Sequence, residues 1–157
     1  MTEEEVKKWL HKYLKLKLMV RSRRKRLQDM EDQELLPGKT DSTRGGTHGS
    51  SSSSMVATDR RIDYEDANTP IIQKAEAEMG AILNAVDALE DPMEREVLYL
   101  RYIDSEYYQP RRWPEVAERM YGDNDEAKMQ AVFRLHRTAI KKIAAAADLS
   151  ANVSECQ

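Results

Sequence analysis

Apolar residues recur at alternating spacings of four and three along two long segments of this chain. In the first segment, about residues 2–35, Arg23 alone interrupts the pattern. This spacing puts the apolar side chains on one stripe of an α-helix, as in a coiled-coil seam. Thr2 is suited to cap the helix, because its hydroxyl can accept a hydrogen bond from a backbone N–H of the first turn. The first seam consists of Trp9, Tyr13, Leu16, Val20, Leu27 and Met30.

A second seam has the same spacing and predicts a second helix. Thr69 and Pro70 suit the start of this helix, since threonine caps well and proline is tolerated at the first helical position. The two helices either form an antiparallel hairpin within one chain or pack between two chains. In the second case the protein is a homo-oligomer through its N-terminal helices. The second seam consists of Ile72, Ala75, Met79, Ile82, Val86 and Leu89.

The segment between the two seams is rich in glycine and serine and has nothing large to bury, so we expect a flexible loop. Beyond residue 90 the pattern changes to several short helices. No segment shows the alternation of a β-strand, and the predicted fold class is therefore all-α. The expected parts are a basic coiled-coil-like helix at 1–36, the loop at 37–63, a second amphipathic helix at 64–90, a bundle of short helices at 91–147 and a disordered tail at 148–157.

The charge of the chain is unevenly distributed. Its formal net charge is −3, yet residues 6–28 contain ten Lys or Arg and no acidic residue. Residues 127–147 contain five Lys or Arg and again no acid, whereas residues 59–90 are acidic. Because a ligand responds to the local field, the acidic total does not exclude a polyanionic partner.

No catalytic or metal-binding pattern stands out in the sequence. His11, His48 and His136 are far apart, and there is one cysteine, so a zinc site is not expected. The glycines of the central loop lack the following Gly-Lys-Ser/Thr of a phosphate loop. We therefore expect a protein that is not an enzyme and that needs no metal or cofactor, with His136 packed in the core.

The sequence also bears on the compartment. Cys156 has no cysteine with which to form a disulfide, which favours a reducing cytoplasm. No run of eighteen apolar residues occurs, and the N-terminal residues lack the pattern of a signal peptide. We expect a cytoplasmic protein with no membrane partner.

The acid-free segment from Ala127 to Ala147 predicts an amphipathic helix with a basic outer side. A shorter helix at about 113–121 precedes it, and the two resemble a helix-turn-helix, whose second helix enters the major groove of DNA. Arg134 could form a bidentate contact with guanine and Gln130 one with adenine, while Arg137, Lys141 and Lys142 neutralise phosphates. Arg111 and Arg112, just before the first helix, are also placed to contact phosphate. The candidate DNA-binding residues are Gln130, Arg134, Arg137, Thr138, Lys141, Lys142, Lys128, Arg111 and Arg112.

Three stretches of the same region also resemble a known family. "MEREVLYLRYID", "WPEVAERMYG" and "VFRLHRTAIKKI" are similar to the helix-turn-helix that forms the fourth conserved region of sigma-70 factors. The resemblance is closer still to the ArpU-type and RinA-type regulators of late transcription in phages of Gram-positive bacteria, and it covers most of the chain. It implies an all-helical phage protein that binds promoter DNA, with Arg134 and Gln130 on the recognition helix. The segment between Met120 and Val132 is longer than the tight turn of that family.

We therefore predict a phage or prophage transcriptional regulator, an activator of late genes, with a DNA-binding domain at 91–147. Its expected partners are double-stranded promoter or operator DNA and host RNA polymerase. Two alternatives remain open: a protein that binds RNA polymerase without reading bases, and the small DNA-recognition subunit of a packaging terminase.

Overall fold

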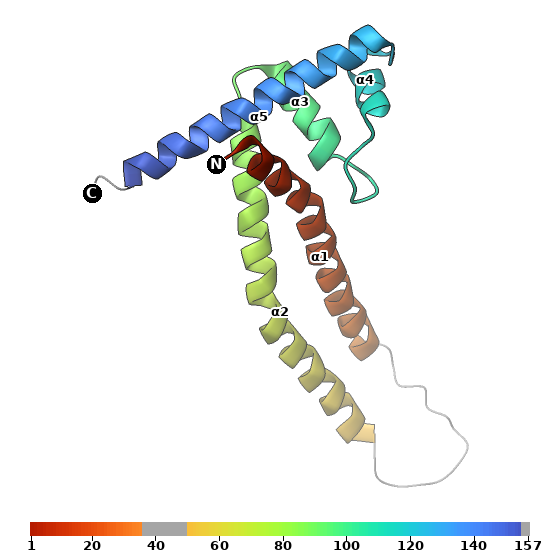
Figure 1. Ribbon diagram of the computed structural model, residues 1–157. Coiled ribbons are helices and arrows are strands. Elements are labelled where there is room, and N and C mark those ends of the chain that lie inside the picture. The colour runs from red at the N-terminus through yellow and green to blue at the C-terminus, as the bar shows by residue number, and fades with distance from the viewer. Residues whose placement is uncertain (36–49, 155–157) are drawn as a thin grey trace. The chain divides into compact units, whose positions relative to one another are not determined.

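The computed structural model of the protein describes the backbone of residues 1–35 and 50–154 and the side chains of residues 1–35 and 55–148. Within these ranges every regular element is helical, which confirms the all-α prediction (Figure 1). A π-helical turn, η1, continues α3 without a break. In chain order the elements are α1 (Glu3–Leu35), α2 (Ser50–Asp87), α3 (Pro92–Leu98), η1 (Tyr99–Ile103), α4 (Trp113–Tyr121) and α5 (Glu126–Ser154).

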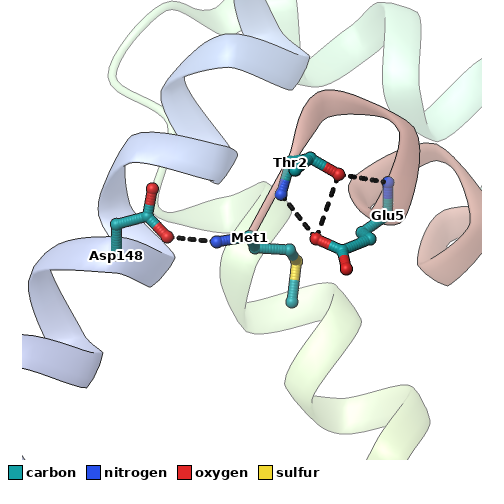
Figure 2. Close-up of polar contacts among 4 residues, drawn as sticks. All are labelled: Met1, Thr2, Glu5 and Asp148. Atoms are coloured by element: carbon teal, nitrogen blue, oxygen red, sulfur yellow. Dashed lines mark hydrogen bonds and ion pairs between the residues drawn. The ribbon is translucent and has the colours of Figure 1, made fainter.

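The start of α1 is closed by a reciprocal pair of side chains, drawn in Figure 2. The Thr2 hydroxyl accepts a hydrogen bond from the Glu5 N–H at 3.3 Å, and the Glu5 carboxylate accepts one from the Thr2 N–H at 2.7 Å. This is a capping box, which satisfies two backbone donors that the helix itself leaves free. The Met1 ammonium group also pairs with Asp148 of α5. The predicted capping role of Thr2 is confirmed.

The predicted start of the second helix is wrong. Helix α2 begins at Ser50, so residues 50–63 of the expected loop are helical, and Pro70 lies inside the helix. Residues 37–49 of that loop lie outside the described residues. The proline removes one backbone donor, but the helix upstream is supported by ion pairs of Arg61 with Glu65 at 3.1 Å and with Glu34 of α1 at 3.0 Å. Packing against a second helix can outweigh one lost hydrogen bond.

The predicted end of the last helix also differs from the structure. Helix α5 continues to Ser154, so residues 148–154 of the expected disordered tail are helical. This stretch contains no Gly or Pro to end the backbone hydrogen-bond ladder. Residues 155–157 lie outside the described residues.

The chain divides into two compact units, and α1 and α2 each run through both of them. We call Met1–Leu18 with Ala77–Gln157 the core unit and Met19–Glu76 the hairpin unit. In the hairpin unit, α1 and α2 are antiparallel, since Arg24 pairs with Glu76 whereas the later Glu34 pairs with the earlier Arg61.

The interior of the hairpin unit contains a polar pair among apolar residues. Val20, Ile72 and Ala75 are buried, as their positions in the predicted seams require. Arg23, which interrupts the seam, donates a hydrogen bond to the side chain of the buried Asn68. Asn68 in turn donates to the Tyr64 carbonyl at 2.7 Å. Arg23, the polar residue in the apolar seam of α1, thus has a polar partner, Asn68, on α2.

The core unit has two hydrophobic clusters. The larger cluster joins the first half of α1 and the last part of α2 to the α3–η1 helix and to α5. The seam residues in this cluster are already buried within one chain. A homo-oligomer that used the same side chains would therefore require these residues of α1 and α2 to lose their contacts with each other. The buried members of this cluster include Val6, Leu10, Tyr13, Leu14, Ile82, Val86, Leu98, Tyr102, Ile140 and Ile143.

The smaller cluster holds the last helices together. Val97 and Leu100 of the α3–η1 helix pack with Val116 and Ala117 of α4 and with Val132 of α5. In Figure 1, α4 lies beside one end of α5, while α3 lies along its middle. This cluster positions the candidate functional site.

Candidate nucleic-acid interface

Helices α4 and α5 are joined by a turn of four residues, Gly122 to Asp125. Gly122 has φ 72° and donates its N–H to the Glu118 carbonyl at 2.7 Å, which ends α4. The Asp125 carboxylate accepts a hydrogen bond from the Lys128 N–H at 2.8 Å and caps α5. The extra residues between Met120 and Val132 therefore lengthen α5 at its start. The connection itself has the length of a helix-turn-helix turn.

Helix α5 separates apolar and basic side chains onto different sides. Val132, Ala139 and Ile140 are fully buried. The opposite side, which we call the outer face, consists of the exposed residues Gln130, Arg134, Arg137, Thr138 and Lys141. Among the described residues, no acidic side chain pairs with Arg134, Arg137 or Lys141. The outer face thus presents three cations that no described carboxylate compensates.

Two lysines predicted for the same role lie elsewhere. The Lys142 ammonium donates to both carboxylate oxygens of Glu94 on α3 at 2.8 Å, and this ion pair raises the pKa of Lys142. Glu94 is 3% exposed, so Lys142 compensates a buried charge. Lys128 is half-buried, with its ammonium 5.8 Å from the centre of the Tyr121 ring. Both lysines were predicted from charge alone, which does not reveal partners on neighbouring helices.

The prediction that Arg111 contacts phosphate is wrong. Arg111 is 7% exposed, and its guanidinium donates to the carbonyls of Leu100 at 2.9 Å and Asp104 at 2.8 Å. These carbonyls lie at the end of the η1 turn, where backbone acceptors lack helical partners, so Arg111 caps that end. Arg112 is exposed and directly precedes α4, where a phosphate contact remains sterically open.

His136 packs in the interior, as predicted. It is 9% exposed, with Nε2 2.9 Å from the Tyr102 hydroxyl and its ring 4.8 Å from that of Trp113. Burial is the main cause that lowers its pKa to about 4, and the positive charge of Arg101 acts in the same direction. The imidazole is therefore neutral at neutral pH.

A groove beside α5 was not apparent from the sequence. It has a volume of about 520 Å³ and is formed by α1, η1, α4 and α5 of the core unit. The Arg101 guanidinium lies 4.0 Å from the centre of the Trp113 ring, and the Trp113 ring is 5.2 Å from that of Phe133. We call this feature the basic groove; its basic side chains and aromatic rings include Lys7, His11, Arg101, Trp113, Phe133 and Arg137. These residues are distant in sequence, so no local motif could reveal it.

The described residues contain no cluster of three His, Cys, Asp or Glu side chains that could hold a metal ion. His48 and Cys156 lie outside this part of the chain. Within the described helices, none is both long and apolar enough to cross a membrane.

Comparison with known proteins adds no assignment. The chain matches no protein-family model, no curated protein and no solved structure among those searched.

Proposed function

We propose that this protein is a DNA-binding transcriptional regulator of phage or prophage origin, an activator of late genes, which uses α4 and α5 as a helix-turn-helix. The observation that carries the proposal is the outer face of α5. Three cations, none of them paired with an acidic side chain among the described residues, lie with a glutamine on the exposed side of a helix that directly follows a four-residue turn. Exposed Arg, Lys and Gln on such a helix are the side chains that contact phosphates and base edges in the major groove.

In this proposal the candidate residues have different roles. Arg134 makes a bidentate contact with guanine, and Gln130 makes one with adenine. Arg137, Lys141 and Arg112 contact phosphates, with Thr138 between them on the same face. The cap residue Asp125 and the acidic Glu126 lie at the start of α5, so we expect docking through the middle of α5 and not through its first turn.

The experiment is a selection of bound duplexes from a random pool with the full chain, followed by footprinting on phage DNA. A regulator should enrich one sequence motif and protect it at a promoter or operator. Repeating the selection with Arg134→Ala should alter the motif at one position, whereas Arg95→Ala on α3 is the matched control and should leave it unchanged. Failure to enrich any motif would refute base readout.

A second candidate function follows from Phe133, which is 37% exposed beside Arg137. Exposed aromatic and arginine side chains are enriched at protein interfaces. This favours the alternative of a protein that binds RNA polymerase without reading bases. It predicts that Phe133→Ala weakens capture of purified host polymerase while duplex binding is unchanged. The small-terminase alternative requires a ring of subunits, which light scattering on the full chain would detect.

A further inference from the structure

The basic groove is positively charged even when its histidines are neutral. Lys7, Arg101 and Arg137 contribute positive charge, and Glu3 is the acidic residue among its described lining. Burial, followed by the charges of Arg101 and Lys15, lowers the pKa of His11, and Arg101 and Lys7 also act on His136. Protonation of either imidazole is thus opposed. The lining of the groove therefore has a net positive charge at neutral pH.

Contacts to neighbouring residues hold Arg101 in this groove. Its guanidinium stacks on Trp113 and donates a hydrogen bond to the Arg111 carbonyl. Arg101 Nε is buried and has no hydrogen-bond partner among the described residues. The charge is therefore fixed in position, which reduces the entropy lost when an anion binds.

The groove is continuous with the outer face of α5, because Arg137 belongs to both. Lys7 lines the groove from α1, so cations of two helices far apart in sequence border one surface. Such continuity suits an extended polyanion better than a single small ion. The Phe133 ring offers an apolar surface of the kind against which a deoxyribose packs.

We propose that the basic groove holds the sugar–phosphate backbone of the DNA strand that flanks the site read by α5, with Lys7 and Arg137 on phosphates. This proposal rests on the proposed function and adds α1 to the DNA interface. Lys7 can take this role because its present partner is Glu4, at 2.6 Å in an exposed pair on the same helix. An exposed ion pair of this kind contributes little to stability, so Lys7 can readily leave Glu4 and bind a phosphate instead.

The test measures equilibrium binding of the full chain to a selected duplex and to a random duplex across a salt series. Lys7→Gln should lower the slope of log affinity against log salt by about one unit. At about 0.1 M salt it should weaken both duplexes by the same factor, roughly five- to tenfold. Lys7→Arg should restore the slope, because the charge is retained.

The matched control is Lys12→Gln, the same change five residues further along α1. The Lys12 ammonium pairs with Glu78 of α2 at 2.5 Å and does not line the groove, so the slope should stay at the wild-type value. Circular dichroism verifies that each variant is folded. Equal salt slopes for wild type and a folded Lys7→Gln would overturn the proposal. That result would favour an acidic protein segment as the ligand of the groove.

The result also separates this proposal from the proposed function. If Arg134→Ala removes the preference for the selected duplex while Lys7→Gln has no effect, base readout stands and the groove proposal is wrong. If the wild-type chain binds no duplex at all, both are wrong.

Discussion

Neighbouring basic residues of this protein have opposite environments. Lys141 is exposed on the outer face, whereas Lys142 forms an ion pair with the buried Glu94. Arg112 is exposed, whereas Arg111 is buried as a helix cap. Substitutions of adjacent residues of the same charge should therefore separate binding from stability.

The first prediction for individual residues distinguishes base readout from electrostatic attraction to DNA of any sequence. Arg134→Ala should cost roughly 1–3 kcal/mol on the selected duplex and little on random DNA, since a lost guanine contact affects one sequence. Lys141→Ala should weaken both duplexes alike and reduce the salt slope by about one unit. Fluorescence anisotropy with both duplexes measures this. An unchanged preference for the selected duplex over random DNA in a folded Arg134→Ala protein would favour the polymerase-binding alternative.

The second prediction concerns the Lys142–Glu94 pair. Lys142→Ala should lower the melting temperature by a few degrees, because it leaves the Glu94 carboxylate buried without its partner. Lys141→Ala is the matched control and should leave the melting temperature unchanged. Adding Glu94→Gln to Lys142→Ala should recover part of the loss. Equal melting temperatures for the two lysine variants would contradict a role of this pair in stability.

The third prediction is a pH dependence caused by His136. Its pKa is lowered from 6.5 to about 4 in the folded chain, so the unfolded state binds the proton more readily. The contribution to stability is fully present above pH 6.5 and is lost as the pH falls towards 4. At pH 5 the free energy of unfolding should be lower by roughly 2 kcal/mol than at pH 7.5.

Denaturant titration at several pH values measures this loss. Arg101, Lys7 and His11 are the charged groups that act on the imidazole. His136→Gln is the control, because an amide can still bond the Tyr102 hydroxyl but does not titrate. The dependence should flatten in this variant, and an equal slope in both proteins would assign it to other groups.

At the scale of the elements, the turn between α4 and α5 depends on one left-handed residue. Gly122 has φ 72°, which other residues adopt at a cost, and a Cβ there would meet nothing within 4 Å. Gly122→Ala should therefore destabilise the protein by roughly 1–2 kcal/mol through backbone conformation alone. Gly80→Ala inside α2, where a Cβ is also unobstructed, should stabilise it by roughly 0.5–1 kcal/mol.

Chemical denaturation of the two variants tests this matched pair. The same substitution should change the free energy of unfolding in opposite directions. If Gly122→Ala is neutral, the four-residue turn does not depend on the left-handed conformation.

At the scale of the whole molecule, the last helices complete their core with parts of α1 and α2. Leu98, Tyr102 and Ile140 share one cluster with Val6, Leu10 and Ile82. A fragment from Asp91 onward should therefore expose apolar surface and melt without a cooperative transition, while the full chain melts cooperatively. Scanning calorimetry and binding of a hydrophobic dye measure both effects. A sharp transition of the fragment would show that residues 91–157 fold independently.

The sequence by itself determined where most helices lie and which of their sides are apolar. The seams through Ile72 and Val86, the turn before α5 and the burial of His136 follow from spacing, because a helix is built from hydrogen bonds and side-chain rows between near neighbours. The end of α5 and the start of α2 differ from the positions that the sequence predicts. Pro70 does not set the start of α2, because the helix upstream of it is supported by an ion pair to α1. Residues 148–154 contain no Gly or Pro that would end α5 earlier.

Only the tertiary structure decided which charged side chains are held by contacts within the protein and which are available to bind a partner. Lys142 and Glu94 are forty-eight positions apart in the chain, and Arg111 is held by carbonyls of the preceding helix. The basic groove likewise combines Lys7 with Arg101 and Arg137. Local periodicity carries no information about such pairs, because an ion pair or a groove is made by residues that meet only when the helices pack.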